Sequence, residues 1–190
     1  AEYEFYGVAM SGRWGINAIA WSPDGMRIAF ANNAGDLSIV DASMTTSISL
    51  CTSCASMVKS LSWSPNGQRL AAGRDLLAAT TVWDTQSGKL IKEIRKGGSR
   101  VAWSPDGGTL AVLSTQLNRV VLLSTTRWTQ MRTLDLPFAS SHLSWSPDGR
   151  SLVAAGASGS VVLLPLDKTA PLVAAPPIVC KNSGVNVYLV

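Results

Sequence analysis

A five-residue motif, Trp-Ser-Pro-Asp-Gly with Asn in place of Asp once, occurs four times in this chain and limits its fold more than any other feature. The copies begin at Trp21, Trp63, Trp103 and Trp145, so successive tryptophans are 42, 40 and 42 residues apart. Pro presets φ for the first central position of a tight turn, and Gly accepts the positive φ that follows. A turn that recurs at a nearly constant period indicates a repeated structural unit.

The residues around each motif predict four short strands per unit. An aliphatic residue lies two positions before each tryptophan and another lies seven positions after it, whereas the residue just before each tryptophan is Ala or Ser. One face of each sheet is therefore bulky and the other small, as is needed when neighbouring sheets cover both faces. The third strands are predicted at 37–40, 80–83, 120–123 and 161–164, and the fourth strands around 47–50, 90–94, 131–134 and 172–174. This pattern predicts an all-β fold made of propeller blades.

The third strand of the second unit ends in Trp83-Asp84, the dipeptide after which WD repeats are named. With this dipeptide, the four turns and the period, the sequence resembles the WD-repeat β-propellers from residue 14 to about residue 180. The resemblance implies a rigid ring, usually of seven blades, that acts as a scaffold for protein-protein interactions. The Gly-His dipeptide of the family is missing from every unit, and His142 is the only histidine. The buried chain of His, Asp, Ser or Thr, and Trp that braces many family blades is therefore not expected here.

The length predicts an incomplete ring. The 190 residues contain about 4.6 units, whereas seven units would need roughly 290 residues. We expect a lead-in at 1–13 that could supply the outer strand of a closing blade, and a tail at 181–190. The four blades are expected at about 14–54, 55–96, 97–138 and 139–180. An open ring exposes apolar blade faces, so we expect part of a larger propeller, or closure by a partner or by self-association.

The charge distribution favours protein partners over nucleic acid. The net charge is +4 and the pI is near 9.2, and the densest basic run comprises Lys89, Lys92, Arg95, Lys96 and Arg100. We interpret this run as a solvated outer strand that is protected from edge pairing by its charge. An acidic partner and a nucleic acid are the alternatives, although no aromatic residues interleave with the cations to stack on bases. Neither a membrane span nor a secretory signal is predicted, and an intracellular location is expected.

Cys51 and Cys54 form a C-x-x-C pair. Zinc needs four ligands, and Cys180 and His142 are the only other cysteine and histidine residues, about three units away. We favour structural thiols over a metal site, a redox pair or a disulfide, and three cysteines without a disulfide framework suit a reducing compartment. No metal and no cofactor are predicted.

Candidate protein-contact residues follow from their expected positions in loops and turns, and they are predictions of exposure more than of function. Trp128 follows the third strand of the third unit, in an apparent insertion outside the repeated pattern. We interpret it as a cap on the outer strand, with an aromatic anchor for a partner as the alternative. The complete set is Arg13, Trp14, Arg74, Asp75, Lys96, Arg100, Arg119, Arg127 and Trp128.

No arrangement of acid, base and nucleophile predicts an enzyme, because one histidine without a nearby acid offers no triad. Within the WD-repeat family, residues 58–136 are similar to propeller nucleoporins of the nuclear pore complex. The similarity lies in the Ala-rich approach to Trp83-Asp84, in Gly97-Gly98 before the Trp103 strand, and in Trp128-Thr129. It implies nucleoporin partners and a location at the nuclear envelope; otherwise a cytoplasmic location is expected. The alternative is an accessory propeller, TolB-like or associated with a peptidase.

Overall fold

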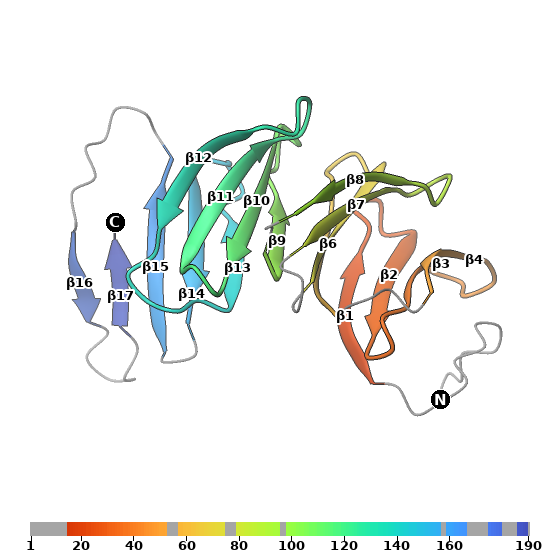
Figure 1. Ribbon diagram of the computed structural model, residues 1–190, viewed down its shortest axis with the longest axis horizontal. Coiled ribbons are helices and arrows are strands. Elements are labelled where there is room, and N and C mark those ends of the chain that lie inside the picture. Colours follow the sequence, from red (N-terminus) through yellow and green to blue (C-terminus); the bar gives the residue numbers. More distant parts are fainter. Residues whose placement is uncertain are drawn as a thin grey trace.

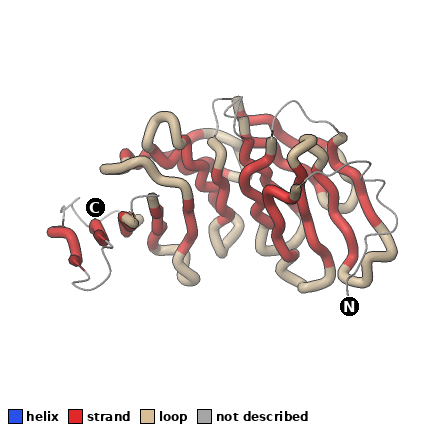
Figure 2. Tube along the Cα trace, turned by 90° about the horizontal axis from the view of Figure 1, so that it is seen from below, coloured by secondary structure: helices blue, strands red, loops and turns tan. Residues whose placement is uncertain are grey.

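The computed structural model describes residues 15–52, 57–74, 79–95, 98–156 and 159–166, together with the backbone of residues 175–179 and 186–189. The described residues form seventeen strands in four sheets. The sheets follow one another along the long axis of the molecule, as Figure 1 shows. Seen from below, their strands stand as successive layers (Figure 2). This arrangement confirms the predicted all-β fold of propeller blades.

The first three blades are antiparallel sheets whose strands pair in chain order. Blade 1 contains β1 (Ile16–Trp21), β2 (Arg27–Asn32), β3 (Leu37–Asp41) and β4 (Ser47–Cys51). Blade 2 contains β5 (Val58–Trp63), β6 (Arg69–Arg74), β7 (Thr80–Asp84) and β8 (Leu90–Ile94). Blade 3 contains β9 (Arg100–Trp103), β10 (Thr109–Ser114), β11 (Arg119–Ser124) and β12 (Gln130–Asp135). The predicted third and fourth strands of these blades agree with the observed ones to within a residue at either end.

Blade 4 departs from this pattern after its third strand. It contains β13 (His142–Trp145), β14 (Ser151–Ala155) and β15 (Ser160–Pro165) in antiparallel order. The next position is held by β17 (Asn186–Leu189), which runs parallel to β15, and β16 (Ala175–Val179) pairs with the far side of β17. The fourth strand predicted around 172–174 lies outside the described residues. A parallel neighbour needs a long crossover, and the 20 positions between residues 165 and 186 supply one.

The repeated motif forms the same turn in all four blades. Its glycines, exemplified by Gly25, have φ values between 68° and 72°. The motif serine orders the turn: Ser22 Oγ donates to Asp24 Oδ1 and accepts a hydrogen bond from the backbone N–H of Arg27. Equivalent bonds form in the other three blades. The serine is therefore as much a part of the turn as the proline and the glycine, a role that the sequence pattern alone did not indicate.

The core lies between consecutive sheets, as the alternation of bulky and small residues predicts. Ala29, Ala31 and Leu37 of blade 1 pack against Trp63 and Leu70 of blade 2. Corresponding clusters join blade 2 to blade 3 and blade 3 to blade 4. Most of these residues are completely buried. Small residues on one sheet therefore make room for tryptophan and leucine on the next.

The motif turns are expected to make the protein acid-sensitive. Hydrogen bonds from Ser22, Ser104 and Ser146 hold the pKa values of Asp24, Asp106 and Asp148 below the ordinary value of 3.8. A carboxyl group whose pKa is lower in the folded chain than in the unfolded chain stabilises the fold at pH values above the unfolded-state pKa. This stabilisation is lost as the pH falls through the folded-state pKa. We therefore expect the free energy of unfolding, measured in urea by circular dichroism, to decrease as the pH falls below 3.8.

Asp148→Asn is the matched variant for this prediction, because Asn66 occupies the same turn position in blade 2 and makes the same bond to its serine. The variant should lose less stability between pH 5 and pH 2, a range of about three units that spans the titration of aspartate. An acid transition that is identical in the variant and the parent chain would contradict a role for the Asp148 carboxyl group.

Candidate functional site

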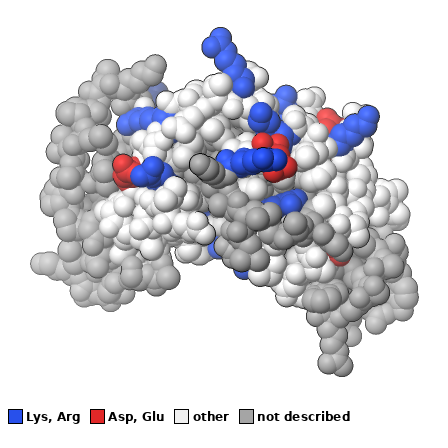
Figure 3. All heavy atoms as spheres, in the orientation of Figure 1, with Lys and Arg blue, Asp and Glu red and all other residues white. Residues whose placement is uncertain are grey.

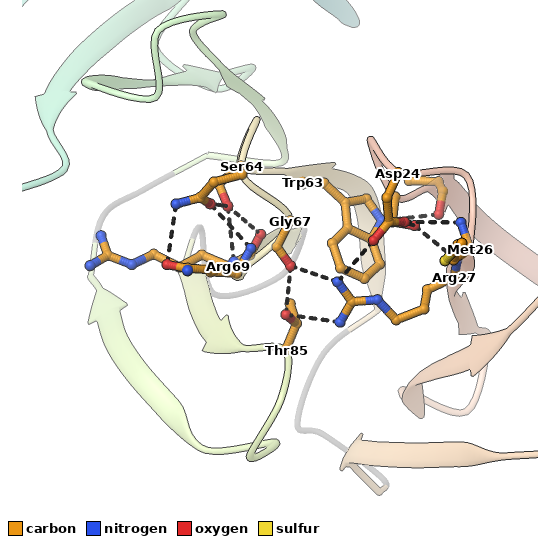
Figure 4. A network of polar contacts seen from close by, with 12 residues as sticks. Asp24, Met26, Arg27, Trp63, Ser64, Gly67, Arg69 and Thr85 are labelled. Atoms are coloured by element: carbon orange, nitrogen blue, oxygen red, sulfur yellow. Dashed lines mark hydrogen bonds and ion pairs between the residues drawn. The ribbon is translucent and has the colours of Figure 1, made fainter.

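Arg27 joins blade 1 to blade 2. It lies at the start of β2 and extends towards the next blade, as Figure 4 shows. Its Nη2 donates to the carbonyl oxygen of Gly67 at 2.9 Å, and its Nη1 donates to Thr85 Oγ1 at 3.2 Å. Its guanidinium carbon lies 5.0 Å from the centre of the Trp63 ring, and Nη2 lies 3.7 Å from Asp24 Oδ2. We call this set of contacts the arginine clasp.

A second arginine clasp joins blade 2 to blade 3. Arg69 corresponds to Arg27, because each lies six residues after a motif tryptophan. Arg69 Nη1 donates to the carbonyl oxygen of Thr125 at 3.2 Å, and Thr125 Oγ1 donates to Gly107 O at 2.7 Å. The Arg69 guanidinium carbon lies 5.8 Å from the centre of the Trp128 ring. The recurrence of arginine at this position was a signal that sequence reasoning missed.

Trp128 belongs to the repeated pattern after all. Its N–H donates to the carbonyl oxygen of Ser124 at 2.8 Å, just as the Gly88 N–H donates to Asp84 O at 3.0 Å in blade 2. Trp128 therefore lies in the same turn after the third strand as Gly88 does. The prediction that it belongs to an insertion outside the repeated pattern was wrong. Its ring meets that of Trp103 edge to face, with 6.2 Å between the ring centres. Trp128 thus packs at the interface of blades 2 and 3.

Loss of the first clasp is expected to weaken the pairing of blades 1 and 2. Arg27→Ala removes two charge-assisted hydrogen bonds and the contact with the Trp63 ring. We expect the free energy of unfolding in urea to fall by about 1–2 kcal/mol. Arg127→Ala is the control, because Arg127 is exposed in a turn, and it should change stability by less than about 0.5 kcal/mol. Equal effects of the two substitutions would mean that the clasp contributes nothing specific.

The inner strands of all four blades line one groove of about 490 Å³. Lys59 on β5, Arg100 on β9 and His142 on β13 contribute basic side chains to its lining, and the described lining residues include no acidic one. Arg100 donates to the carbonyl oxygens of Ser141 and Lys59, so its guanidinium group is held in place between neighbouring blades. His142 Nδ1 lies 2.9 Å from Ser141 Oγ. We call this feature the inner-strand groove.

The predicted contact residues are not brought together into one surface. Arg100 lines the inner-strand groove, Arg119 forms an ion pair with Asp135 at 3.3 Å, and Arg127 is exposed. The expected exposure of Arg74 was wrong: it is only 9% exposed because it ends β6 instead of lying in the following turn. Its burial lowers the pKa of its guanidinium group. The remaining candidates lie outside the described residues: Arg13, Trp14, Asp75 and Lys96.

Cys51 is disulfide-bonded, so the interpretation of the cysteines as structural thiols was wrong for this residue. Its partner lies outside the described residues. Within the described ranges, no three His, Cys, Asp or Glu side chains are grouped as metal ligands would be. In the same ranges no helix has the length and apolar character needed to cross a membrane.

Comparisons with known proteins agree with the fold. The family model described as "WD domain, G-beta repeat" matches residues 45–77 and 129–163, and each match begins near the outer strand of one blade and continues into the next. Hydrazine synthase of Kuenenia stuttgartiensis has a similar structure, with a TM-score of 0.70 and 26% identity over 87% of this chain. This chain covers 50% of that one. A search of curated proteins found no significant match. The repeat and the four sheets agree with this family match, so residues 45–77 and 129–163 are similar to WD40 repeats and the fold is that of propeller blades.

Proposed function

We propose that this chain is a non-enzymatic protein-interaction module that holds an acidic segment of a partner protein in its inner-strand groove. The observation that carries this proposal is the convergence of Lys59, Arg100 and His142 from three blades on one groove. Several cationic groups that converge on a concave surface raise the local concentration of an anionic ligand. The hydrogen bonds of Arg100 to two carbonyl oxygens hold its charge in place before a ligand arrives.

The basic run of the sequence is a weaker candidate for the same partner. Lys89 precedes the outer strand β8 and Lys92 lies within it, and Arg95 pairs with Glu93 at 3.6 Å. Exposed charges of this kind are well screened by water and salt. Figure 3 shows cationic side chains spread over one face of the molecule, some of them next to acidic ones. The exposed and half-buried residues of β8 support the interpretation of the run as a solvated outer strand.

A labelled deca-glutamate peptide tests the groove by fluorescence anisotropy at low salt. Lys59→Gln combined with His142→Gln should weaken binding by about tenfold, since the lysine cation and the imidazole side chain are both removed from the groove. Lys89→Gln combined with Lys92→Gln removes two lysines at the outer strand and should leave binding nearly unchanged. A loss of binding in the second variant alone would move the site to the outer strand. Absence of binding by the parent chain would overturn the acidic-partner proposal.

The absence of catalysis is part of the proposal. Hydrazine synthase is the name of the similar structure, but this chain corresponds to half of that one. The lone histidine of the sequence, His142, faces Ser141, and the lining residues that the structure describes include no carboxylate that could orient its ring as in a Ser-His-Asp triad. A pairing of Ser141 with His142 therefore lacks its third member within the groove. These features favour binding over chemistry.

A place in the nuclear pore complex is the finer proposal, and it rests on the resemblance of residues 58–136 to the propeller nucleoporin aladin. The family match and the similar structure support the WD40 repeat in general and do not single out aladin. Affinity purification of the tagged chain from its native cells would distinguish the candidates. Co-purification of pore proteins supports the nucleoporin, whereas recovery of a peptidase or an envelope complex supports the accessory propeller.

A further inference from the structure

The interface between blades 3 and 4 has a pocket where the first two interfaces have an arginine. Thr109 lies six residues after Trp103, at the position that Arg27 and Arg69 occupy in the two preceding blades. The pocket has a volume of about 420 Å³, and Thr109, Trp145 and other residues of both blades line it. We call it the third-interface pocket. The missing side chain explains why there is space between these two sheets.

The groups that contact Arg27 in the first clasp have counterparts in the lining of this pocket. Trp63 corresponds to Trp145, Gly67 to Gly149, and Asp24 to Asp106, and all three counterparts line the pocket. An aromatic face, a backbone carbonyl and a carboxylate that receive Arg27 in the first interface are thus present in the third, where threonine holds the clasp position. The pocket also has apolar walls, to which Leu122 and Leu166 contribute.

Asp106 is positioned as Asp24 is. In both residues Oδ1 accepts bonds from the motif serine and from a backbone N–H two residues later. In Asp24 the other oxygen, Oδ2, faces the Arg27 guanidinium group at 3.7 Å. Asp106 Oδ2 has no hydrogen bond to any residue in the described part of the chain. The bonds from Ser104 and from the backbone N–H of Gly108 hold the pKa of Asp106 below its ordinary value, so the carboxylate is charged at neutral pH.

We propose that the third-interface pocket binds an arginine side chain of a partner protein. The guanidinium group stacks on the Trp145 ring, donates to the Gly149 carbonyl oxygen and faces the Asp106 carboxylate, and its methylene stem lies against Leu166. Arg132 is the one basic residue among the described residues of the lining. The planar guanidinium group is more weakly hydrated than an ammonium group and stacks better on an aromatic ring, which favours arginine over lysine. The proposal rests on the proposed function as an interaction module, but it uses a different site.

N-acetyl-arginine methylamide is the probe, and the indole N–H resonance of Trp145 is the reporter in a 1H-15N NMR titration of the whole chain. The resonance is assigned by its loss in Trp145→Phe. We expect the probe to shift this resonance with an affinity in the millimolar range, as suits a single side chain. N-acetyl-citrulline methylamide has nearly the same shape without the charge, and it should bind at least about tenfold more weakly. Equal shifts with the two probes would overturn the proposal, as would no shift with arginine.

Two variants locate the bound probe. Asp106→Asn reproduces the residue found naturally at Asn66 in blade 2, so the turn should be kept while arginine binding weakens by about tenfold. Thr109→Arg supplies the missing clasp from the chain itself, and it should abolish probe binding and raise Tm by a few degrees, whereas Thr109→Gln should not raise Tm. If the probe binds Asp106→Asn as tightly as it binds the parent chain, it binds elsewhere and the proposal is overturned. This outcome does not depend on whether Thr109→Arg folds. The deca-glutamate peptide tests the groove separately, so either site can fail without the other.

Discussion

Replacing Gly98 with alanine is expected to lower the free energy of unfolding by about 3 kcal/mol or more, at the upper end of the cost of overpacking a core. A Cβ atom at this position would lie 2.0 Å from the carbonyl oxygen of Leu113 and 2.4 Å from its carbonyl carbon. Leu113 belongs to β10, which is paired on both sides with β9 and β11. The backbone of a central strand cannot yield without breaking that pairing, so the segment before β9 must move. Urea denaturation followed by circular dichroism measures the loss.

Gly108→Ala is the control for this experiment. Its added Cβ atom would lie 3.4 Å from Asp106 Oδ2, a contact at the near edge of the ordinary range and with a side chain that can adjust. We expect a change of less than about 1 kcal/mol. If Gly98→Ala is as stable as Gly108→Ala, the segment before β9 does not approach β10 as closely as the structure has it.

Gly98 also illustrates what the sequence could not predict. The replacement of the family's Gly-His by Gly97-Gly98 was visible in the sequence, but its reason depends on the close approach of Leu113, fifteen residues further along the chain. The fold itself was predictable because its signal is local: a five-residue turn and alternating residue sizes recur in register. The recurrence of Arg27 and Arg69 at one repeat position was visible, but their partners were not, because each clasp joins residues about 40 or more positions apart.

The missing histidine had a smaller structural effect than the family pattern implies. The full hydrogen-bond chain was predicted not to form, and a tryptophan and an aspartate at its positions still find partners within their own blades. Trp83 Nε1 donates to Thr81 Oγ1 at 3.1 Å in blade 2, and Asp36 accepts a bond from Asn32 Nδ2 at 2.9 Å in blade 1. The pairing of β17 with β15 was not predictable, because parallel strands joined by a long crossover leave no turn signal between them.

The second large effect is expected for Trp63→Ala, with a loss of about 3–5 kcal/mol in the free energy of unfolding. Trp63 is 8% exposed, its Nε1 donates to the carbonyl oxygen of Ala20 at 3.1 Å, and its ring receives the Arg27 guanidinium group. The substitution removes all three contributions at the interface of blades 1 and 2. Thermal or urea unfolding of the purified variant measures the effect.

Trp21→Ala is the matched comparison, because Trp21 has the same place in the repeat but is 59% exposed. It should cost less than about 1 kcal/mol if nothing covers this face of blade 1. The glycines of the turns agree with an open face. An added Cβ at Gly67, Gly107 or Gly149 would contact a proline of the preceding blade, whereas one at Gly25 would contact no described residue within 4 Å.

Trp21→Ala could instead lower the free energy of unfolding by nearly as much as Trp63→Ala does. That result would show that another blade covers this face of blade 1 in solution, since Ile19 and Met26 beside Trp21 are also largely exposed in the single chain. Light scattering then identifies the source of that blade. A dimer that Trp21→Ala converts to monomer would assign it to a second copy, and a monomer in both forms would assign it to the same chain. A small cost together with a monomeric mass would instead mean that four blades are stable with their first face in water.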